Sequence, residues 1–207
     1  MAFITFEGIE GCGKSTQARR LAERLGGRAL LTREPGGTAI GLAVRKVLLD
    51  PESRGMAPMT ELLLYFADRA QHVAEVVRPA LAQGLVVLCD RHVESSLAYQ
   101  GYGRGLPLEA IRALAQLATG GLRPDTIVLF DVPVELGLAR ARKRGAHDRL
   151  EAELLEFHER VRAGYETLAA QEPERWLRVD GSGPADAVFE SLWRALAGRG
   201  LVPGEAA

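Results

Sequence analysis

The 207-residue sequence lacks the features of several protein classes. Its two cysteines, Cys12 and Cys89, are too few for the disulfide framework of a small secreted domain. It has no run of about 18 uncharged apolar residues, so we expect no membrane-spanning helix. The N-terminus has neither the basic n-region nor the cleavage site of a signal peptide. These absences predict a cytoplasmic protein.

An excess of charge of either sign is also missing. Lysine and arginine number 26, aspartate and glutamate 27, and the net charge is −1. The chain therefore has no global basic field to attract a nucleic-acid polymer or an anionic membrane. Its length suits one α/β domain with a sizeable core, and we expect residues 1–207 to form a single domain.

Strand-like apolar segments alternate with helix-like segments along the chain. This alternation is typical of an α/β fold, in which helices cover a parallel sheet. The expected strands are residues 2–6, 28–32, 85–90, 126–131 and 176–180. The expected helices are residues 15–25, 40–49, 60–83, 107–118, 133–144, 149–170 and 184–198. Pro79 should kink or break the third of these helices.

The stretch FEGIEGCGKST, residues 6–16, connects the first expected strand to the first helix. It fits the G-x-x-x-x-G-K-[ST] pattern of a P-loop, whose backbone N–H groups bind phosphate at the positive end of a helix dipole. Lys14 is expected to contact the β- and γ-phosphates of a nucleotide, and Ser15 to ligate Mg²⁺. The expected triphosphate-binding residues are Gly8, Ile9, Glu10, Gly11, Cys12, Gly13, Lys14, Ser15 and Thr16.

Charged residues follow two of the other expected strands. Arg33 and Glu34 come after the second strand, and Asp90 and Arg91 after the third. The carboxyl ends of parallel strands share one edge, where such folds bind ligands. P-loop enzymes place an acid for Mg²⁺ there, although an aspartate at a strand end is often only a helix cap. Asp90 favours the metal because Arg91 and His92 follow it, whereas Asp131 is expected to cap the next helix.

Several arginines are a second indication of phosphate binding. Arg33, Arg45, Arg69 and Arg91 are all expected at or near this edge. A guanidinium group suits a phosphate monoester better than an ammonium group does. The alternative for each of them, and most readily for Arg45, is a surface ion pair that contributes little.

The segment ARARKRGAHDR, residues 139–149, concentrates basic residues between two expected helices. A basic run is usually a solvated helix face or a nucleic-acid tail. In a chain with a P-loop, it favours a short lid of about residues 139–150 that folds over a triphosphate. The candidate catalytic arginines are Arg140, Arg144 and Arg149. Arg149 is the first choice, because the start of the next helix can orient it.

These motifs resemble the thymidylate kinases, which transfer a phosphoryl group from ATP to dTMP. The resemblance runs nearly end to end and is most specific in REPGGT together with DRH…S…AYQG, which other nucleoside monophosphate kinases lack. It implies a three-layer P-loop fold with a five-stranded parallel sheet flanked by helices. It also implies phosphorylation of dTMP to dTDP with ATP and Mg²⁺, a step in dTTP synthesis, by a homodimer.

The resemblance implies roles around the substrate phosphate and sugar. Arg33, Arg45 and Arg91 would hold the dTMP phosphate. Glu10 would bind the sugar 3′-hydroxyl or the metal shell, and Glu34 would lie near the same hydroxyl and the Mg²⁺. The expected metal residues are Ser15, Asp90 and Glu10. The expected catalytic residues outside the lid are Lys14 and Arg91.

It implies roles around the base as well. Tyr65, where the family usually has phenylalanine, would stack on thymine, and Arg69 would donate a hydrogen bond to its O4. Ser96 and Gln100 would contact the base and its surroundings. Tyr99 would crowd the 2′ position and so disfavour ribose.

The catalytic arginine of this family lies either in the P-loop or in the lid. Gly11 occupies the P-loop position here, so the chain resembles the branch that uses the lid. Residues 179–182 would border the adenine.

Two alternative functions stay open. One is a kinase for another monophosphate or a nucleoside, and the other is a P-loop nucleotide switch or motor. The second alternative is disfavoured, because the chain has no guanine-reading [NT]-K-x-D stretch.

Overall fold

The computed structural model describes residues 1–143, 149–151 and 153–202. Five parallel strands form one sheet in the order β2-β3-β1-β4-β5. They are β1 (Ala2–Glu7), β2 (Ala29–Arg33), β3 (Val86–Asp90), β4 (Thr126–Asp131) and β5 (Trp176–Asp180). The expected five-stranded α/β fold is confirmed, and every strand begins and ends within one residue of its prediction.

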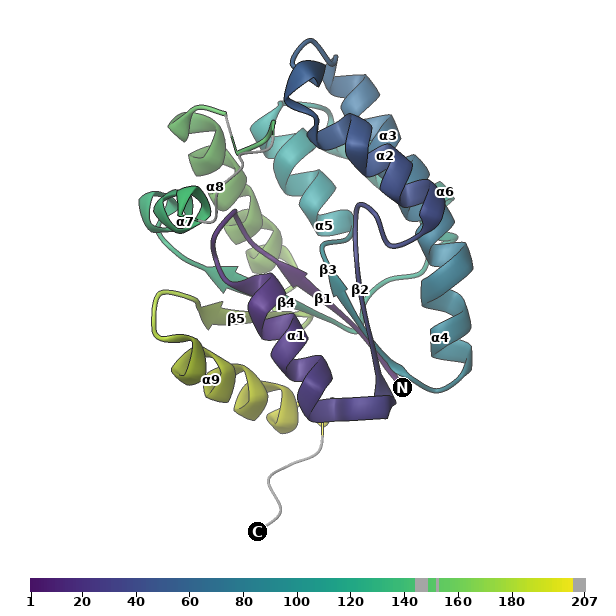
Figure 1. Ribbon diagram of the computed structural model, residues 1–207, viewed down its shortest axis with the longest axis vertical. Coiled ribbons are helices and arrows are strands. Elements are labelled where there is room, and N and C mark those ends of the chain that lie inside the picture. The colour runs from purple at the N-terminus through teal and green to yellow at the C-terminus, as the bar shows by residue number, and fades with distance from the viewer. Residues whose placement is uncertain (144–148, 152, 203–207) are drawn as a thin grey trace.

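Helices connect the strands and flank the sheet, with α1 and α9 side by side (Figure 1). The α-helices are α1 (Lys14–Leu25), α2 (Ala39–Leu49), α3 (Pro58–His72), α4 (Arg78–Ala82), α5 (Val93–Ser96), α6 (Leu108–Thr119), α7 (Val134–Arg142), α8 (Leu155–Gln171) and α9 (Ala185–Gly198). Two segments are π-helical, η3 (Val73–Val77) and η4 (Leu97–Gly103). Two are 3₁₀-helical, η1 (Gly26–Arg28) and η2 (Pro51–Ser53). None of the helices in the described ranges has both the length and the apolar character to cross a membrane.

The central strand β1 carries the P-loop at its carboxyl end. All six of its residues are buried, as expected for a parallel strand covered on both faces. Ile4 and Phe6 belong to the large core cluster that includes Leu21 of α1. Phe3 belongs to a smaller cluster with Val77 and Ala80. The P-loop therefore starts from a strand that both clusters hold in place.

Three helical segments differ from the prediction. The helix expected over residues 60–83 is α3, the π-helical η3 and then α4, so Pro79 changes the helix type without ending it. Proline has no N–H for the regular ladder, and a π turn just before it accommodates this gap. The sequence predicted no helix for α5 and η4, and the helix expected from residue 149 begins at Leu155.

The prediction that Asp131 caps α7 is wrong. The N-terminus of α7 has no side-chain cap. Asp131 Oδ1 instead accepts a hydrogen bond from Arg162 Nε at 2.8 Å, and Oδ2 lies 2.5 Å from Arg178 Nη2. Burial would raise the pKa of Asp131, but the two arginines lower it. The carboxylate at the end of β4 thus connects this strand to both α8 and β5.

Candidate active site

A cavity of about 510 Å³ opens at the carboxyl-end edge of the sheet. Open parallel sheets bind ligands at this edge. The structure brings most of the predicted site residues together there. The predicted residues that line the cavity are Glu10, Lys14, Ser15, Arg33, Glu34, Arg45, Tyr65, Asp90, Arg91, Ser96, Tyr99 and Gln100.

The P-loop turns tightly between β1 and α1. Gly8, Gly11 and Gly13 have φ angles of +137°, +70° and +97°, which favour glycine. A Cβ atom on Gly11 would lie 1.9 Å from the carbonyl oxygen of Gly137 on α7. A side chain at position 11 therefore has no room while α7 holds this position, and the P-loop cannot carry an arginine there.

The first turn of α1 faces the end of β3. Lys14 is mostly buried, and its Nζ donates to the carbonyl oxygen of Ile9 within the P-loop at 3.3 Å. Ser15 Oγ donates to Asp90 Oδ2, and Asp90 Oδ1 is buried with no hydrogen-bond partner in the described part of the chain. Mg²⁺ prefers oxygen ligands. A hydroxyl and a partly unpaired carboxylate beside the cavity fit this ion.

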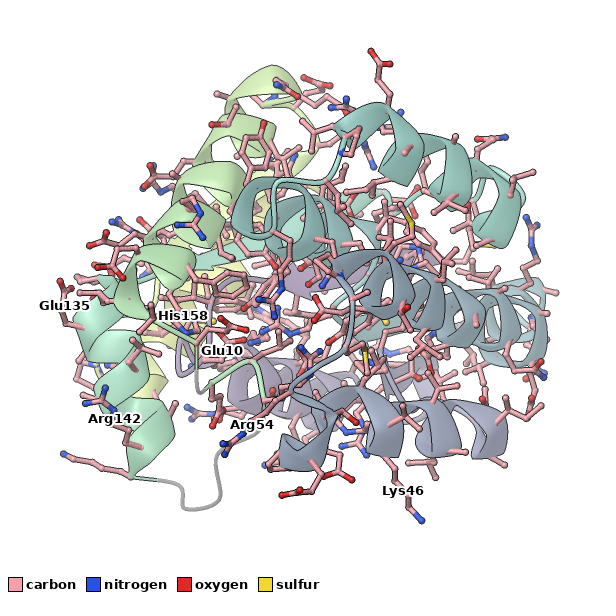
Figure 2. The ribbon with its side chains drawn as sticks, turned by 90° about the horizontal axis from the view of Figure 1, so that it is seen from above. Glu10, Lys46, Arg54, Glu135, Arg142 and His158 are labelled. Atoms are coloured by element: carbon pink, nitrogen blue, oxygen red, sulfur yellow. The ribbon has the colours of Figure 1, made fainter. Side chains whose placement is uncertain are left out.

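Glu10 is the carboxylate of the P-loop, and three groups surround it. Its Oε1 accepts hydrogen bonds from Tyr99 Oη at 2.6 Å and Arg91 Nη2 at 3.0 Å. His158 of α8 lies close, with Nδ1 3.3 Å from Glu10 Oε2 (Figure 2). Burial would raise the pKa of Glu10, but His158, Arg91 and Lys14 hold it well below its ordinary value. Glu10 is therefore ionised and balances the charge of Arg91.

Arg91 has a strained backbone. Among the described residues it is the one non-glycine with positive φ, at +76°. Such a conformation persists only where surrounding contacts impose it, and it clusters at functional sites. The backbone N–H donates to the carbonyl oxygen of Phe6 at 3.0 Å, and Nη1 donates to Ser95 Oγ at 3.1 Å and Tyr165 Oη at 3.3 Å. These contacts fix the guanidinium in the cavity wall.

Arg33 and Arg45 approach the same cavity from other elements. Arg33 is exposed at the end of β2. Arg45 extends from α2, and its Nη1 donates to the carbonyl oxygen of Pro35 at 3.0 Å. Together with Arg91, which lies between β3 and α5, they bring three arginines from separate parts of the chain to the cavity, and Arg19 of α1 lines it as well. This concentration of positive charge suits a phosphate monoester.

Arg69 lies behind the cavity wall, because its side chain is only 1% exposed. Its Nε donates to Glu34 Oε2 at 2.7 Å, Nη1 to Ser96 Oγ at 3.1 Å, and Nη2 to the carbonyl oxygen of His92 at 2.7 Å. Arg69 therefore holds two cavity-lining residues in place. Its predicted direct contact with a base stays a prediction.

Glu34 is also held by two histidines, His72 and His92, whose contacts with it the sequence did not predict. Its Oε1 lies 2.8 Å from His72 Nδ1 and 3.0 Å from His92 Nδ1. Burial would raise the pKa of Glu34, but Arg69, His92 and His72 hold it well below its ordinary value. Glu34, His72 and Cys89 place three potential metal-binding atoms within 4.8 Å of one another. The positive charge of Arg69 on the same carboxylate disfavours a metal ion there.

Arg140 contacts the segment expected to border adenine. Its Nη1 donates to the carbonyl oxygen of Gly181 and its Nη2 to that of Ser182, both at 2.7 Å. Arg140 thereby ties α7 to the loop between β5 and α9. Arg144, the second lid candidate, lies outside the described residues.

Arg149 is mostly buried at the far end of the expected lid. Its Nη2 lies 2.5 Å from Glu61 Oε2, and its Nε donates to the carbonyl oxygen of Leu48 on α2 at 3.0 Å. The guanidinium does not line the cavity, although the next residues, Leu150 and Glu151, do. Arg149 thus connects the end of the lid to α2 and α3.

The cavity thus combines residues of the P-loop with a group of arginines. The family model of thymidylate kinase matches residues 6–192. The chain belongs to the thymidylate kinase family. The thymidylate kinase of Synechococcus sp. is 56% identical over 196 residues, with 92% of each chain covered. The thymidylate kinase of Desulfovibrio desulfuricans is 54% identical over 196 residues, with 90% of each chain covered.

A solved thymidylate kinase structure agrees with the assignment to this family. The crystal structure of the Ehrlichia chaffeensis thymidylate kinase is similar with a TM-score of 0.77 at 34% sequence identity. The match covers 94% of this chain and 98% of that chain. The similarity to the thymidylate kinase fold therefore extends over nearly the whole molecule.

Proposed function

We infer that this enzyme transfers the γ-phosphoryl group of ATP to the phosphate of dTMP, giving dTDP and ADP in a step of dTTP synthesis. Membership of the thymidylate kinase family supports this activity. One structural observation carries the inference. Glu10, Lys14 and Ser15 of the P-loop line the same cavity as three of the arginines, Arg33, Arg45 and Arg91. A donor and an acceptor phosphate can therefore be held side by side.

Catalysis rests on positioning and charge stabilisation, as is usual for phosphoryl transfer. The phosphate of dTMP is largely a dianion near neutral pH, so its oxygen attacks without a general base. Arg33, Arg45 and Arg91 hold this phosphate, and Lys14 stabilises charge on the β- and γ-phosphates of ATP. Mg²⁺, held by Ser15 and Asp90 with Glu10 nearby, would neutralise further charge on these phosphates.

The base and sugar of dTMP bind on the other side of the cavity from the phosphates of ATP. Tyr65 stacks on thymine, and Ser96 and Gln100 contact its edge. Arg69 supports Ser96 from behind and reaches toward thymine O4. The ring of Tyr99 excludes a 2′-hydroxyl group, which gives a preference for deoxyribose.

A lid arginine stabilises the transferring phosphoryl group. The absence of space for a side chain at Gly11 supports a source outside the P-loop. Arg140 and Arg149 make structural contacts elsewhere, so we assign this role first to Arg144. The lid, about residues 139–150, is part of a single kinase domain that spans residues 1–207.

Exposed apolar side chains on α2 and α3 support a homodimer. Ile40 and Val47 of α2 and Met59 and Leu63 of α3 are between 43% and 56% exposed. Their spacings of seven and four residues place each pair on one helix face. The two helices pack side by side, so a second copy of the chain can cover both faces together (Figure 1).

The cytoplasmic location expected from the sequence stays a prediction.

A panel of phosphoryl acceptors tests the proposed function. ADP release is measured with ATP, Mg²⁺ and, in separate reactions, dTMP, dUMP, CMP, AMP or thymidine. We expect the highest kcat/KM with dTMP. Background turnover with dTMP, together with clear turnover of another acceptor, would contradict the proposed substrate.

A further inference from the structure

Glu61 of α3 is a buried carboxylate next to the base side of the cavity. Its side chain is 1% exposed. Oε1 accepts a hydrogen bond from Gln100 Nε2 at 2.8 Å. Oε2 lies 2.5 Å from Arg149 Nη2 and 3.2 Å from Arg104 Nη2. One carboxylate therefore contacts a cavity-lining amide and two guanidinium groups.

The charge of Glu61 decides how the Gln100 amide is turned. Burial would raise the pKa of Glu61, but Gln100, Arg104 and Arg149 lower it below its ordinary value. An ionised carboxylate only accepts hydrogen bonds, so the NH₂ end of the amide faces Glu61. Because Gln100 lines the cavity, its carbonyl oxygen is the end that remains for a bound base.

We propose that Glu61 is a positioning residue that sets base selectivity by turning the carbonyl oxygen of Gln100 toward the base. The proposal rests on the proposed function and extends it. A carbonyl oxygen accepts a hydrogen bond, so it favours thymine or uracil, which carry a hydrogen on N3. Cytosine has a lone pair on N3, and two acceptors that face each other leave both without a donor.

A neutral residue at position 61 removes this constraint. Glutamine at position 61 has both a donor and an acceptor, so it can pair with the Gln100 amide in either orientation. Gln100 can then offer its NH₂ group to cytosine N3. Selectivity against cytosine falls, even though every residue in direct contact with the base is unchanged.

The test compares kcat/KM for dTMP with kcat/KM for dCMP in the full-length enzyme. Glu61→Gln is expected to lower the dTMP-to-dCMP ratio at least tenfold, mainly through the KM values of the two acceptors, with a smaller change in the KM for ATP. Arg104→Met is the matched control, because it removes another partner of the same carboxylate and keeps the Gln100 contact. Its ratio should stay within about twofold of wild type, because Gln100 keeps its hydrogen bond to Glu61. A twofold change in kcat/KM corresponds to well under 1 kcal/mol of free energy.

Gln100→Met provides a second route that leaves Glu61 in place. It should lower the ratio by itself, and Glu61→Gln added to it should lower the ratio no further. An unchanged ratio in folded Glu61→Gln or in Gln100→Met overturns the proposal, and so does an equal loss in Arg104→Met. If wild type does not phosphorylate dTMP, the proposed function fails. If wild type selects dTMP and Glu61→Gln keeps the ratio, only the present proposal fails.

Discussion

Glu10 and Glu34 are acidic residues of the cavity that are buried against specific cations. Glu10 pairs with Arg91 at 3.0 Å, and Glu34 with Arg69 at 2.7 Å. Removing one member of a buried pair leaves the other charge uncompensated, which typically costs about 3–5 kcal/mol. At the scale of single residues, these candidate binding groups are therefore also stabilising groups. A substitution in either pair changes both properties.

Arg69→Ala tests whether Arg69 contributes to dTMP binding in addition to its structural role. We expect the KM for dTMP to rise about tenfold or more, because a lost hydrogen bond to a charged group costs about 1.5–3 kcal/mol. The KM for ATP should change much less, since Arg69 contacts Glu34 and Ser96 rather than the P-loop. Steady-state kinetics with each substrate varied provides the measurement, and Arg69→Lys, which keeps the charge, serves as the control. Equal increases in both KM values would mean that Arg69 is only structural.

The sequence predicted those site residues that occur in local motifs. Lys14 and Ser15 follow from the P-loop pattern, and Asp90 and Arg91 from the end of a strand. His158 and Tyr165 were missed, because they lie on a helix with no motif and reach the site only through packing. The nearly complete burial of the Arg69 side chain was missed for a similar reason. Its helical spacing from Tyr65 predicts a shared face but not the contacts with Glu34, which follows β2, and Ser96 of α5.

At the scale of elements, the P-loop and α7 are in such close contact that neither Gly11 nor Gly137 has room for a side chain. A Cβ on Gly11 meets the backbone of Gly137, and a Cβ on Gly137 would lie 2.5 Å from the carbonyl oxygen of Glu10. Two glycines therefore allow α7, which leads into the expected lid, to pack directly on the P-loop. An arginine of the expected lid can then stabilise the negative charge of the transition state.

Arg144→Met and Arg149→Met test which lid residue acts in catalysis. We expect Arg144→Met to lower kcat about a thousandfold or more, the weaker end of the effect of an arginine finger. The affinity for ATP should change little, because the contact forms mainly in the transition state. Arg149→Met should mainly lower Tm, since it leaves Glu61 with one guanidinium partner fewer. The measurements are single-turnover rates, ATP binding and thermal unfolding.

The reverse pattern would contradict this assignment. If Arg149→Met lost kcat while Arg144→Met kept it, the buried ion pair with Glu61 would have to open during the reaction. If Arg140, Arg144 and Arg149 could each be replaced with near-normal kcat, the lid would not supply the catalytic charge.

The strands were predictable because each is a short apolar run that ends at a charged residue. The region of α5 and η4 was not, because its polar and glycine residues have no clean period. Its helical form depends on packing instead. A Cβ on Gly101 would lie 2.5 Å from Leu108 Cδ2, and one on Gly103 would lie 2.7 Å from Phe157 Cε2. Such close approaches, of η4 to α6 and of η4 to α8, depend on packing between elements and leave no local signal.

At the scale of the whole molecule, the apolar face of α2 and α3 predicts the assembly. We expect the wild-type enzyme to be a dimer by light scattering. Leu63→Glu should shift it toward the monomer, because a charge in an apolar interface loses hydration without a partner. Leu154→Glu, at the more exposed start of α8, is the matched control and should stay dimeric. A wild-type monomer, or equal behaviour of the two variants, would exclude this face as the interface.

The central claim is that one cavity holds ATP and dTMP together and directs the phosphoryl group to dTMP rather than to water. The most direct test follows the label from γ-labelled ATP with and without dTMP. With dTMP, the label should move into dTDP and little should be released as inorganic phosphate. Without dTMP, release should stay near background. Equal release of labelled phosphate in both reactions, with no labelled dTDP, would identify a nucleotide hydrolase and contradict the account.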